Sequence, residues 1–359
     1  MAFSFEFKSD DIDDDECQDE EMTNSCPLET SEHDQNLKPV RWHTLEDMLQ
    51  TLPSQISYTF HSIPSDPPTQ LPRRDLFDIR AQLLAELDME DASSTTLADV
   101  LISDDIKPKL YEGGFKTWEC SIDLARLILH RGRFPLLNTH VIELGCGTAV
   151  PSCTILYQLL LEHPPGTPRS ASNPVRTLIL ADYNEHVLTH ASIANLLLTF
   201  ANFSSTNDAD SSTMEAGYGN ISISSKLVDA FRSWLDYNRI QIFGMSGPWN
   251  VHFEEMVNLQ LQGRKLILAS ETIYQPESIE PFVKVLLGLM EGGQSTEQYC
   301  QALVAAKKVY FGVGGGIDEF LSYLTQAGGD ADIVWESGEA GVGRAILLIK
   351  SSHERRIQH

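Results

Sequence analysis

Apolar and polar positions along this chain fall into blocks that predict strands and helices in alternation. Short apolar runs such as VIELG (141–145) and TLILAD (177–182) have the length and composition of buried strands. Between them, HVLTHASIANLLLTF (186–200) carries apolar residues at helical spacing. Strands that alternate with helices form a parallel sheet with helices on both faces. We therefore predict an α/β fold built on a doubly wound, mostly parallel sheet.

The chain from about residue 110 onward continues this alternation. Further strands are predicted at RIQIFGM (239–245), KLILAS (265–270), KKVYFGVGGG (307–316), DIVWES (332–337) and RAILLIK (344–350). Further helices are predicted at SIDLARLILHRG (121–132), PSCTILYQLLLEH (151–163), KLVDAFRSWLDY (226–237), SIEPFVKVLLGLM (278–290) and IDEFLSYLTQAGG (317–329). No helix separates the last two strands, which predicts an antiparallel C-terminal hairpin at one edge of a seven-stranded sheet.

The N-terminal part of the chain has a different composition. Its first 36 residues hold 13 acidic side chains and one lysine. Such a segment buries too little apolar surface to offset the entropy of ordering, so we expect residues 1–38 to be a disordered acidic tail. The tail has two interpretations, a solubilising segment or a docking segment for a basic protein.

The remaining boundaries follow from changes in composition. Residues 39–110 are expected to form an N-terminal extension that is rich in proline and contains an amphipathic helix at 75–90. Residues 111–352 form the predicted main domain, and 353–359 a short tail. Two polar stretches, near 164–174 and 203–224, are interpreted as insertions.

Composition also limits the possible partners. The net charge of −25 argues against direct binding to nucleic acid and favours a basic protein partner. The six cysteines form no CxxC pair and no His/Cys cluster has zinc spacing, so we expect reduced thiols and no metal. No apolar run reaches about 18 residues and no signal peptide pattern is present, so no membrane association is expected.

The stretch VIELGCGTAVP (141–151) carries the clearest chemical signal. Gly145 and Gly147 allow a tight turn and a close approach of the backbone to a ligand. A dinucleotide loop would have a third glycine where Val150 stands, which disfavours an NAD-dependent oxidoreductase. Instead, the loop matches the pattern acidic-x-G-x-G-x-G, with Glu143 at the strand end and Ala149 in place of the third glycine. The next strand ends in Asp182, whose carboxylate can accept both hydroxyls of a ribose.

S-adenosylmethionine suits this loop better than NAD does. The sulfonium and amino groups of that cofactor bring positive charge toward Glu143, and it has no pyrophosphate that must be bound. The alternative is an ordinary strand-to-helix turn followed by an N-capping aspartate. Because both features occur in register along the chain, the nucleoside interpretation is favoured.

Other segments link this loop to a known family. YEGGFKTWECSIDLARLI, SGPWN and LASETIYQPESI, together with IELGCGTAVP, resemble the seven-β-strand S-adenosylmethionine-dependent methyltransferases. More closely, they are similar to the protein histidine methyltransferases that modify a large-subunit ribosomal protein. The blocks FSFEF, LPSQISYTF and RRDLFDIRAQLLAE near the N-terminus also resemble that branch. The resemblance covers most of the chain and implies a class I, Rossmann-like methyltransferase fold.

The resemblance implies a set of residues that bind the cofactor. These are Thr117, Trp118, Glu119, Cys120, Ser121, Glu143, Gly145, Gly147, Asp182, Tyr183, Asn184, Gly247, Pro248, Trp249 and Ser270. The family more often has an acidic residue at the position of Pro248, so a carboxylate contact to the adenine is lost here. Glu271 and Tyr274 follow the fourth strand and are expected to face the acceptor channel as candidate catalytic residues, although a helix-start glutamate and a packing tyrosine would occur there too.

These implications define the expected function. The chain is expected to be a protein-L-histidine N-methyltransferase that acts at Nτ of a ribosomal-protein histidine and releases S-adenosyl-L-homocysteine. It would be a monomer in cytoplasm and nucleus, with a role in ribosome biogenesis. Two alternatives stay open at this point: a lysine methyltransferase of the same branch, and a non-catalytic ribosome-assembly or chaperone factor on the same fold.

Overall fold

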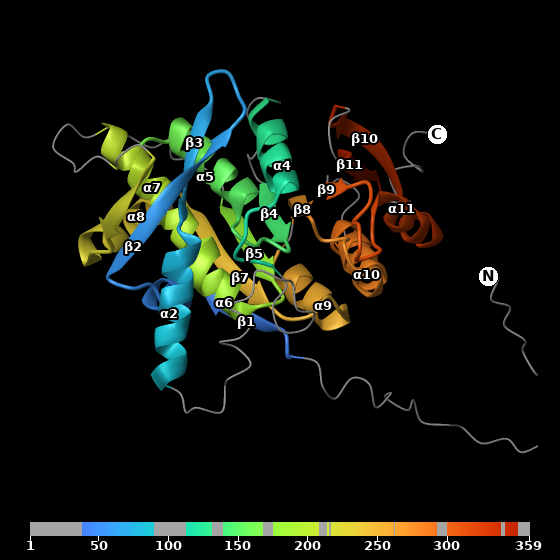
Figure 1. Ribbon diagram of the computed structural model, residues 1–359, viewed down its shortest axis with the longest axis horizontal. Coiled ribbons are helices and arrows are strands. Elements are labelled where there is room, and N and C mark those ends of the chain that lie inside the picture. The colour runs from blue at the N-terminus through green and yellow to red at the C-terminus, as the bar shows by residue number, and fades with distance from the viewer. Residues whose placement is uncertain are drawn as a thin grey trace, which may run out of the picture. The chain divides into compact units, whose positions relative to one another are not determined.

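The computed structural model describes residues 38–89, 113–130, 139–167, 175–207, 214, 217–261, 263–292, 300–338 and 342–350. They form an eight-stranded sheet, helices on both of its faces and a second sheet of three strands (Figure 1). The predicted acidic tail, except for its last residue, and the C-terminal tail at 353–359 lie outside these residues. So do most of the predicted insertion near 164–174 and part of the one near 203–224.

The main sheet has a mixed but mostly parallel order. From one edge to the other its strands are β1 (Arg41–Thr44), β7 (Ile240–Ser246), β5 (Arg176–Asp182), β4 (Thr139–Leu144), β8 (Arg264–Ser270), β9 (Cys300–Lys307), β11 (Arg344–Lys350) and β10 (Asp330–Glu336). The five strands from β7 to β9 are parallel, and β11 is antiparallel to both of its neighbours. The predicted doubly wound sheet with a C-terminal hairpin is thus confirmed, and β1 adds a further antiparallel strand beside β7.

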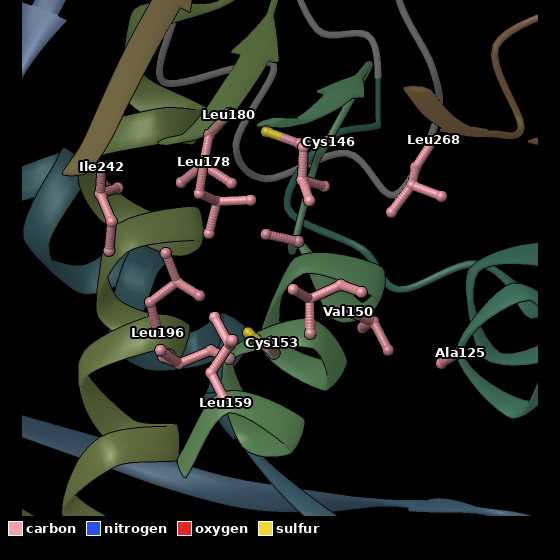
Figure 2. Packing of buried hydrophobic residues seen from close by; sticks show 14 of the residues in the cluster. Ala125, Cys146, Val150, Cys153, Leu159, Leu178, Leu180, Leu196, Ile242 and Leu268 are labelled. Atoms are coloured by element: carbon pink, nitrogen blue, oxygen red, sulfur yellow. The ribbon is translucent and has the colours of Figure 1, made fainter. Parts of the chain in front are cut away.

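The helices lie in two layers because alternate strand residues point to opposite faces. Val141 and Leu178 face one core cluster, whereas Ile142 and Ile179 face the other. The first face is covered by α4 (Glu119–His130), α5 (Val150–Glu162), α7 (Ile193–Asn207) and α8 (Ser225–Tyr237), and the second by α9 (Val251–Gln260), α10 (Pro276–Glu291) and α11 (Ile317–Gln326). Figure 2 shows the first cluster, in which α5 and α7 pack side by side against the strands.

The strand order reverses at β4, which creates a topological switch point at the carboxyl ends of the central strands. β4 lies between β5 and β8, and the chain moves outward from β4 in one direction through β5 and β7 and in the other through β8 and β9. Open α/β sheets bind ligands at the carboxyl ends of the strands where the strand order reverses. The carboxyl ends of β4, β5, β7 and β8 are therefore the place to look for a site.

The N-terminal extension supplies two of the three strands of the smaller sheet. In order, this sheet consists of β3 (Thr69–Arg74), β2 (Gln55–Ile63) and β6 (Tyr218–Ser222). β6 comes from the segment that was predicted as an insertion, and it pairs with β2. Ile56 and Tyr58 of β2 pack on Ala194 and Leu198 of α7. The extension also contains α1 (Leu45–Gln50) and α2 (Leu76–Met89), and α2 confirms the helix predicted at 75–90.

The fifth predicted strand is misplaced in the sequence analysis. We predicted it at 307–316, but β9 spans Cys300–Lys307 and the glycine-rich stretch after it is a loop. Gly312 and Gly314 have φ of 81° and 105°, which strands do not use. A Cβ on Gly315 would lie 2.4 Å from the carbonyl oxygen of Ile273, so the loop packs directly on the segment after β8. The alanines of β9 are small but fully buried, which hid the strand from a hydrophobicity pattern.

The helix after β5 has an irregular start. α6 (Glu185–Val187) continues into the π-helical turn η2 (Leu188–Ser192) and then into α7. Within the described part of the chain, Glu185–Ser204 is the one helix long and apolar enough to cross a bilayer, and 89% of its most apolar window is buried inside the protein. Its apolar residues pack against the first face of the sheet and against the smaller sheet.

Candidate active site

The turn after β4 is shaped by residues with positive φ. Gly145, Gly147 and Ala149 have φ of 63°, 51° and 54°. A Cβ on Gly145 would lie 2.6 Å from Cγ2 of Thr272, and one on Gly147 would lie 3.1 Å from the carbonyl oxygen of Gly114. Both glycines are therefore needed for conformation and for space. The two glycines let the loop turn tightly and pack closely on neighbouring segments at the switch point.

Asp182 lies at the end of β5 and is held in a fixed orientation. Its Oδ2 accepts the backbone N–H of Gly147 at 3.1 Å, and its Oδ1 accepts the N–H of Asn184 at 3.0 Å. Its backbone carbonyl accepts the N–H of Gly247, which follows β7. One carboxylate thus joins the turns after β4 and β5, and its position matches the predicted role of accepting ribose hydroxyls. Tyr183 and Asn184 are half-buried beside it.

Glu143 is placed beneath the loop. Its side chain is fully buried, and Oε2 accepts both the N–H and the hydroxyl of Ser152 in the first turn of α5. Oε1 is buried with no hydrogen-bond partner among the described residues. Burial raises the pKa of Glu143 to about 8, helped by the negative charge of Asp182, and the Ser152 contacts offset only part of this. A positive charge above the loop would compensate this carboxylate, which fits the predicted cationic cofactor.

The residues after β7 and β8 close the other side of the loop. Trp249 is half-buried, stacks in a tilted arrangement on Phe282 at 5.0 Å, and lies 3.8 Å from the position of a Cβ on Gly145. Gly247 has φ of 123° and packs on the backbone of Pro39 and Val40. Pro248 between them is half-buried and Ser270 at the end of β8 is buried. These predicted adenine-side residues all lie at the carboxyl edge of the sheet.

The segment Thr117–Ser121 is tied to the loop through hydroxyl groups. Thr117 Oγ1 lies 2.8 Å from Thr148 Oγ1 and 2.8 Å from Nε2 of His61 on β2. Burial lowers the pKa of His61 to about 4, with a smaller contribution from Arg73. The neutral ring therefore fixes Thr117 at physiological pH. Ser121, in the first turn of α4, donates its hydroxyl to the carbonyl of Trp118.

Trp118 is surrounded by cations. Its indole N–H donates to the carbonyl of Gly113 at 3.1 Å, and the ammonium groups of Lys116 and Lys307 each lie 5.2 Å from its ring centre. Glu119 is exposed and pairs with Lys307 at 3.1 Å. The negative charge that we predicted for the cofactor at Glu119 is thus shared with a lysine of β9.

Glu271 and Tyr274, which are predicted to face the acceptor channel, lie beside residues of β9 and of the loop after it. Glu271 Oε1 lies 3.7 Å from Lys307 Nζ and accepts the N–H of the buried Cys120 at 3.4 Å. Tyr274 and Tyr310 are in edge contact with ring centres 6.3 Å apart. Burial raises the pKa of the Tyr310 hydroxyl, and the nearby carboxylate of Glu271 raises it further. The backbone of Glu271 has φ of 57°, which is rare outside glycine and is typical of functional sites.

Five residues of the site were missed by the sequence analysis. They are His61, Thr148, Thr272, Lys307 and Tyr310. Both Lys307 and Tyr310 were placed in the strand predicted at 307–316, whereas Lys307 is the last residue of β9 and Tyr310 lies in the loop after it. Thr148 directly follows Gly147, and Thr272 directly follows Glu271. Both threonines therefore lie in segments that the sequence analysis had already assigned to the site. His61 had none, because it comes from the smaller sheet.

The chain has sequence relatives among known proteins. No protein-family model matches it. Histidine protein methyltransferase 1 of Saccharomyces cerevisiae is 32% identical over 387 aligned positions, which cover 98% of this chain and 99% of the yeast protein. The protein of the same name from Schizosaccharomyces pombe is 33% identical and covers 85% of this chain and 83% of its own length.

Solved structures give more distant similarities. A putative class I S-adenosylmethionine-dependent methyltransferase from Listeria monocytogenes covers 77% of this chain and 69% of its own, with 10% identity and a TM-score of 0.37. Magnesium protoporphyrin IX methyltransferase from Synechocystis covers 74% and 97%, with 9% identity and a TM-score of 0.32. The assignment depends on the sequence relatives, since they match nearly end to end: the chain belongs to the histidine protein methyltransferase 1 family.

Proposed function

We propose that this chain transfers a methyl group from S-adenosylmethionine to Nτ of a histidine in a large-subunit ribosomal protein. Family membership assigns it to protein histidine methylation. The ring nitrogen and the ribosomal substrate are the parts that go beyond the family name. Both are implied by the resemblance of the N-terminal blocks and of the TWECS and SETIY segments.

The observation that best supports cofactor binding is the pair of backbone hydrogen bonds that the Asp182 carboxylate accepts. They orient the carboxylate toward a ligand that lies along the Gly145–Gly147 turn, where ribose hydroxyls can donate to it. The buried Oε1 of Glu143 has no hydrogen-bond partner among the described residues, which fits a positively charged ligand above the turn. Trp249 offers a stacking surface for the adenine. When bound, S-adenosylmethionine supplies an electrophilic methyl group on its sulfonium.

The acceptor side suits an imidazole. With an ordinary pKa near 6.5, a substrate histidine is largely neutral at pH 7 and one ring nitrogen already has a free lone pair. Catalysis then needs alignment and selection of the tautomer more than a strong base. Glu271 can accept the proton of the non-reacting ring nitrogen, and Tyr274 can pack against the ring. Lys307 Nζ lies 3.7 Å from Glu271 Oε1, so the carboxylate is held in place for this role.

The substrate class is supported by charge. The chain carries a net charge of −25, so electrostatic attraction favours a strongly basic protein such as those of the large ribosomal subunit. We propose that the chain works as a monomer on this substrate in cytoplasm and nucleus. Direct binding to nucleic acid is disfavoured by the same charge.

A methylation assay with mass spectrometry tests the proposal. Large-subunit proteins from cells that lack the enzyme are incubated with the chain and labelled S-adenosylmethionine, and the modified residue is mapped. We expect one histidine to carry the label at Nτ. Asp182→Ala should abolish labelling while the exposed Asp236→Ala on α8 leaves it unchanged. Label on lysine alone would contradict histidine as the acceptor, and label on histidine of other proteins alone would contradict the ribosomal substrate.

A further inference from the structure

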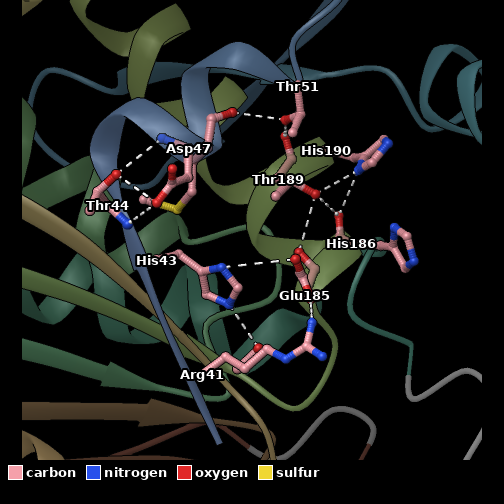
Figure 3. Close-up of polar contacts among 11 residues, drawn as sticks. Arg41, His43, Thr44, Asp47, Thr51, Glu185, His186, Thr189 and His190 are labelled. Atoms are coloured by element: carbon pink, nitrogen blue, oxygen red, sulfur yellow. Dashed lines mark hydrogen bonds and ion pairs between the residues drawn. The ribbon is translucent and has the colours of Figure 1, made fainter.

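Two histidines and a glutamate meet at a place that has no part in the proposed methyl transfer. Glu86 comes from α2, His186 from α6 and His190 from η2. One ligand atom of each residue lies within 4.8 Å of those of the other two. Figure 3 shows His186 and His190 on the same helical segment. Glu86 and His190 are 104 positions apart in the chain, which is why no metal spacing is visible in the sequence.

His190 has the position of a metal ligand. Its ring is almost fully buried, and Nε2 points at the carboxylate of Glu86, 3.1 Å from Oε1 and 3.0 Å from Oε2. The other nitrogen, Nδ1, lies 3.1 Å from the carbonyl oxygen of His186. The hydroxyl of Thr189 lies closer to Nδ1, at 2.8 Å, and can donate a hydrogen bond to it or accept one from it.

The contacts of the two ring nitrogens are compatible with metal binding. A cation between Nε2 and Glu86 would leave Nδ1–H to donate to the His186 carbonyl or to the Thr189 hydroxyl. Histidines that bind metals typically make this second contact to a carbonyl or carboxylate.

His186 supplies the third ligand from the same helical face. It precedes His190 by one turn, and the two rings are in edge contact with centres 5.6 Å apart. Ligand atoms around a tetrahedral ion with bonds of 2.0–2.1 Å lie about 3.3 Å apart. His186 and Glu86 are exposed and can move the short distance required, while the buried His190 stays in place. The π-helical turn that contains His190 is a feature often found at functional sites.

We propose that Glu86, His186 and His190 bind one divalent transition-metal ion of the zinc type. Two imidazoles and one carboxylate are borderline ligands that select zinc, cobalt or nickel over magnesium and calcium. The ion would fasten α2 of the N-terminal extension to the helix that begins directly after Asp182, Tyr183 and Asn184. The nearby Arg74 guanidinium donates to Gln82 and to the backbone carbonyl of His190, so it is engaged with these acceptors.

Titration of the full chain with Zn²⁺ tests this site independently of any methylation assay. We expect one ion per chain by calorimetry and a rise in melting temperature on its addition. His186→Ala and Glu86→Gln should each weaken binding at least about tenfold and abolish the rise. His252→Ala on α9, which removes another exposed histidine, should bind like the wild type.

Cobalt gives a second readout, since the visible spectrum of bound Co²⁺ reports its coordination number. A tetrahedral spectrum that is lost in His186→Ala supports the site. The proposal is overturned if the wild type binds no ion stoichiometrically, or if His186→Ala and Glu86→Gln bind as tightly as the wild type. His186 is exposed, so its replacement leaves the fold intact and either result is informative.

Discussion

Glu271 Oε1 lies 3.7 Å from Lys307 Nζ, and this pair joins the turn after β8 to the end of β9. Burial by itself lowers the pKa of Lys307, but Glu271 and Glu119 outweigh it and raise the pKa above its ordinary value. The lysine is therefore charged at neutral pH. It holds the Glu271 carboxylate after the end of β8, and the rings of Tyr274 and Tyr310 meet in the segments that follow β8 and β9.

Loss of the Glu271 carboxylate should slow the reaction without weakening the cofactor. We expect Glu271→Gln to lower kcat by about a hundredfold, since a positioned proton acceptor contributes at least that much. The dissociation constant for S-adenosylmethionine, measured by calorimetry, should change little. Glu280→Gln on the exposed face of α10 serves as the matched control and should leave kcat unaltered. A kcat equal to that of the wild type would remove Glu271 from the catalytic residues.

A side chain at Gly145 should destabilise the protein and block the cofactor. Gly145→Ala forces an L-residue to a φ of 63° and places its Cβ 2.6 Å from Thr272. Strain and overpacking together should lower the free energy of unfolding by about 2–4 kcal/mol, measured in urea. Gly166→Ala separates the two effects, because Gly166 has φ of 81° but no atom within 4 Å of the new Cβ. Gly166→Ala should lower the free energy of unfolding by only about 1 kcal/mol. Equal losses in both variants would show that the close approach to Thr272 carries no cost.

The parts of the fold that sequence patterns predict are those in which burial and periodicity agree. Parallel strands such as β5 are apolar on both faces, with Leu178 in one core cluster and Ile179 in the other, and the helices between the strands have apolar residues at helical spacing. β9 was placed wrongly because three of its buried residues are alanines, which give little hydrophobic signal. The larger apolar residues after it belong to a loop. The smaller sheet was missed for another reason. β6 pairs with β2 from more than a hundred residues away, and polar edge strands carry little hydrophobic signal.

The residues of the candidate site also fall into those that sequence patterns predict and those that they do not. Gly145, Gly147 and Asp182 were found because their spacing relative to strand ends follows from backbone geometry. Lys307 and His61 were missed because side-chain partners from distant segments depend on the tertiary packing. Glu143 was identified, but its full burial was not foreseen. The sequence marks it as an acidic strand end and has no information on the first turn of α5 that covers it.

Acid should destabilise the protein through His61. Its folded pKa of about 4 lies below the ordinary value of 6.5, so the unfolded chain binds the proton more tightly. Stability is therefore lost as pH falls from about 6.5 toward 4 and is constant on either side of that window. His61→Gln should remove this contribution to the pH dependence. The free energy of unfolding of the variant should therefore fall less steeply than that of the wild type between pH 6.5 and 4. The control is His252→Gln, whose curve should follow the wild type. Parallel curves for His61→Gln and the wild type would show that the ring is not buried as described.

Glu143 should couple cofactor binding to proton release. In the free protein its pKa of about 8 lies above the ordinary 4.5, so the folded state holds a proton and stability falls as pH rises from 4.5 to 8. A cationic ligand over the loop favours the ionised form and lowers this pKa. Affinity for S-adenosylmethionine should accordingly increase between pH 6 and about 8, and calorimetry in buffers of different ionisation enthalpy should detect released protons. In Glu143→Gln, binding should be weaker and the proton release that belongs to this carboxyl should disappear. Comparison with that variant also cancels the titration of the cofactor's own amino group. Identical proton release in the two proteins would mean that Glu143 does not sense the charge of the ligand.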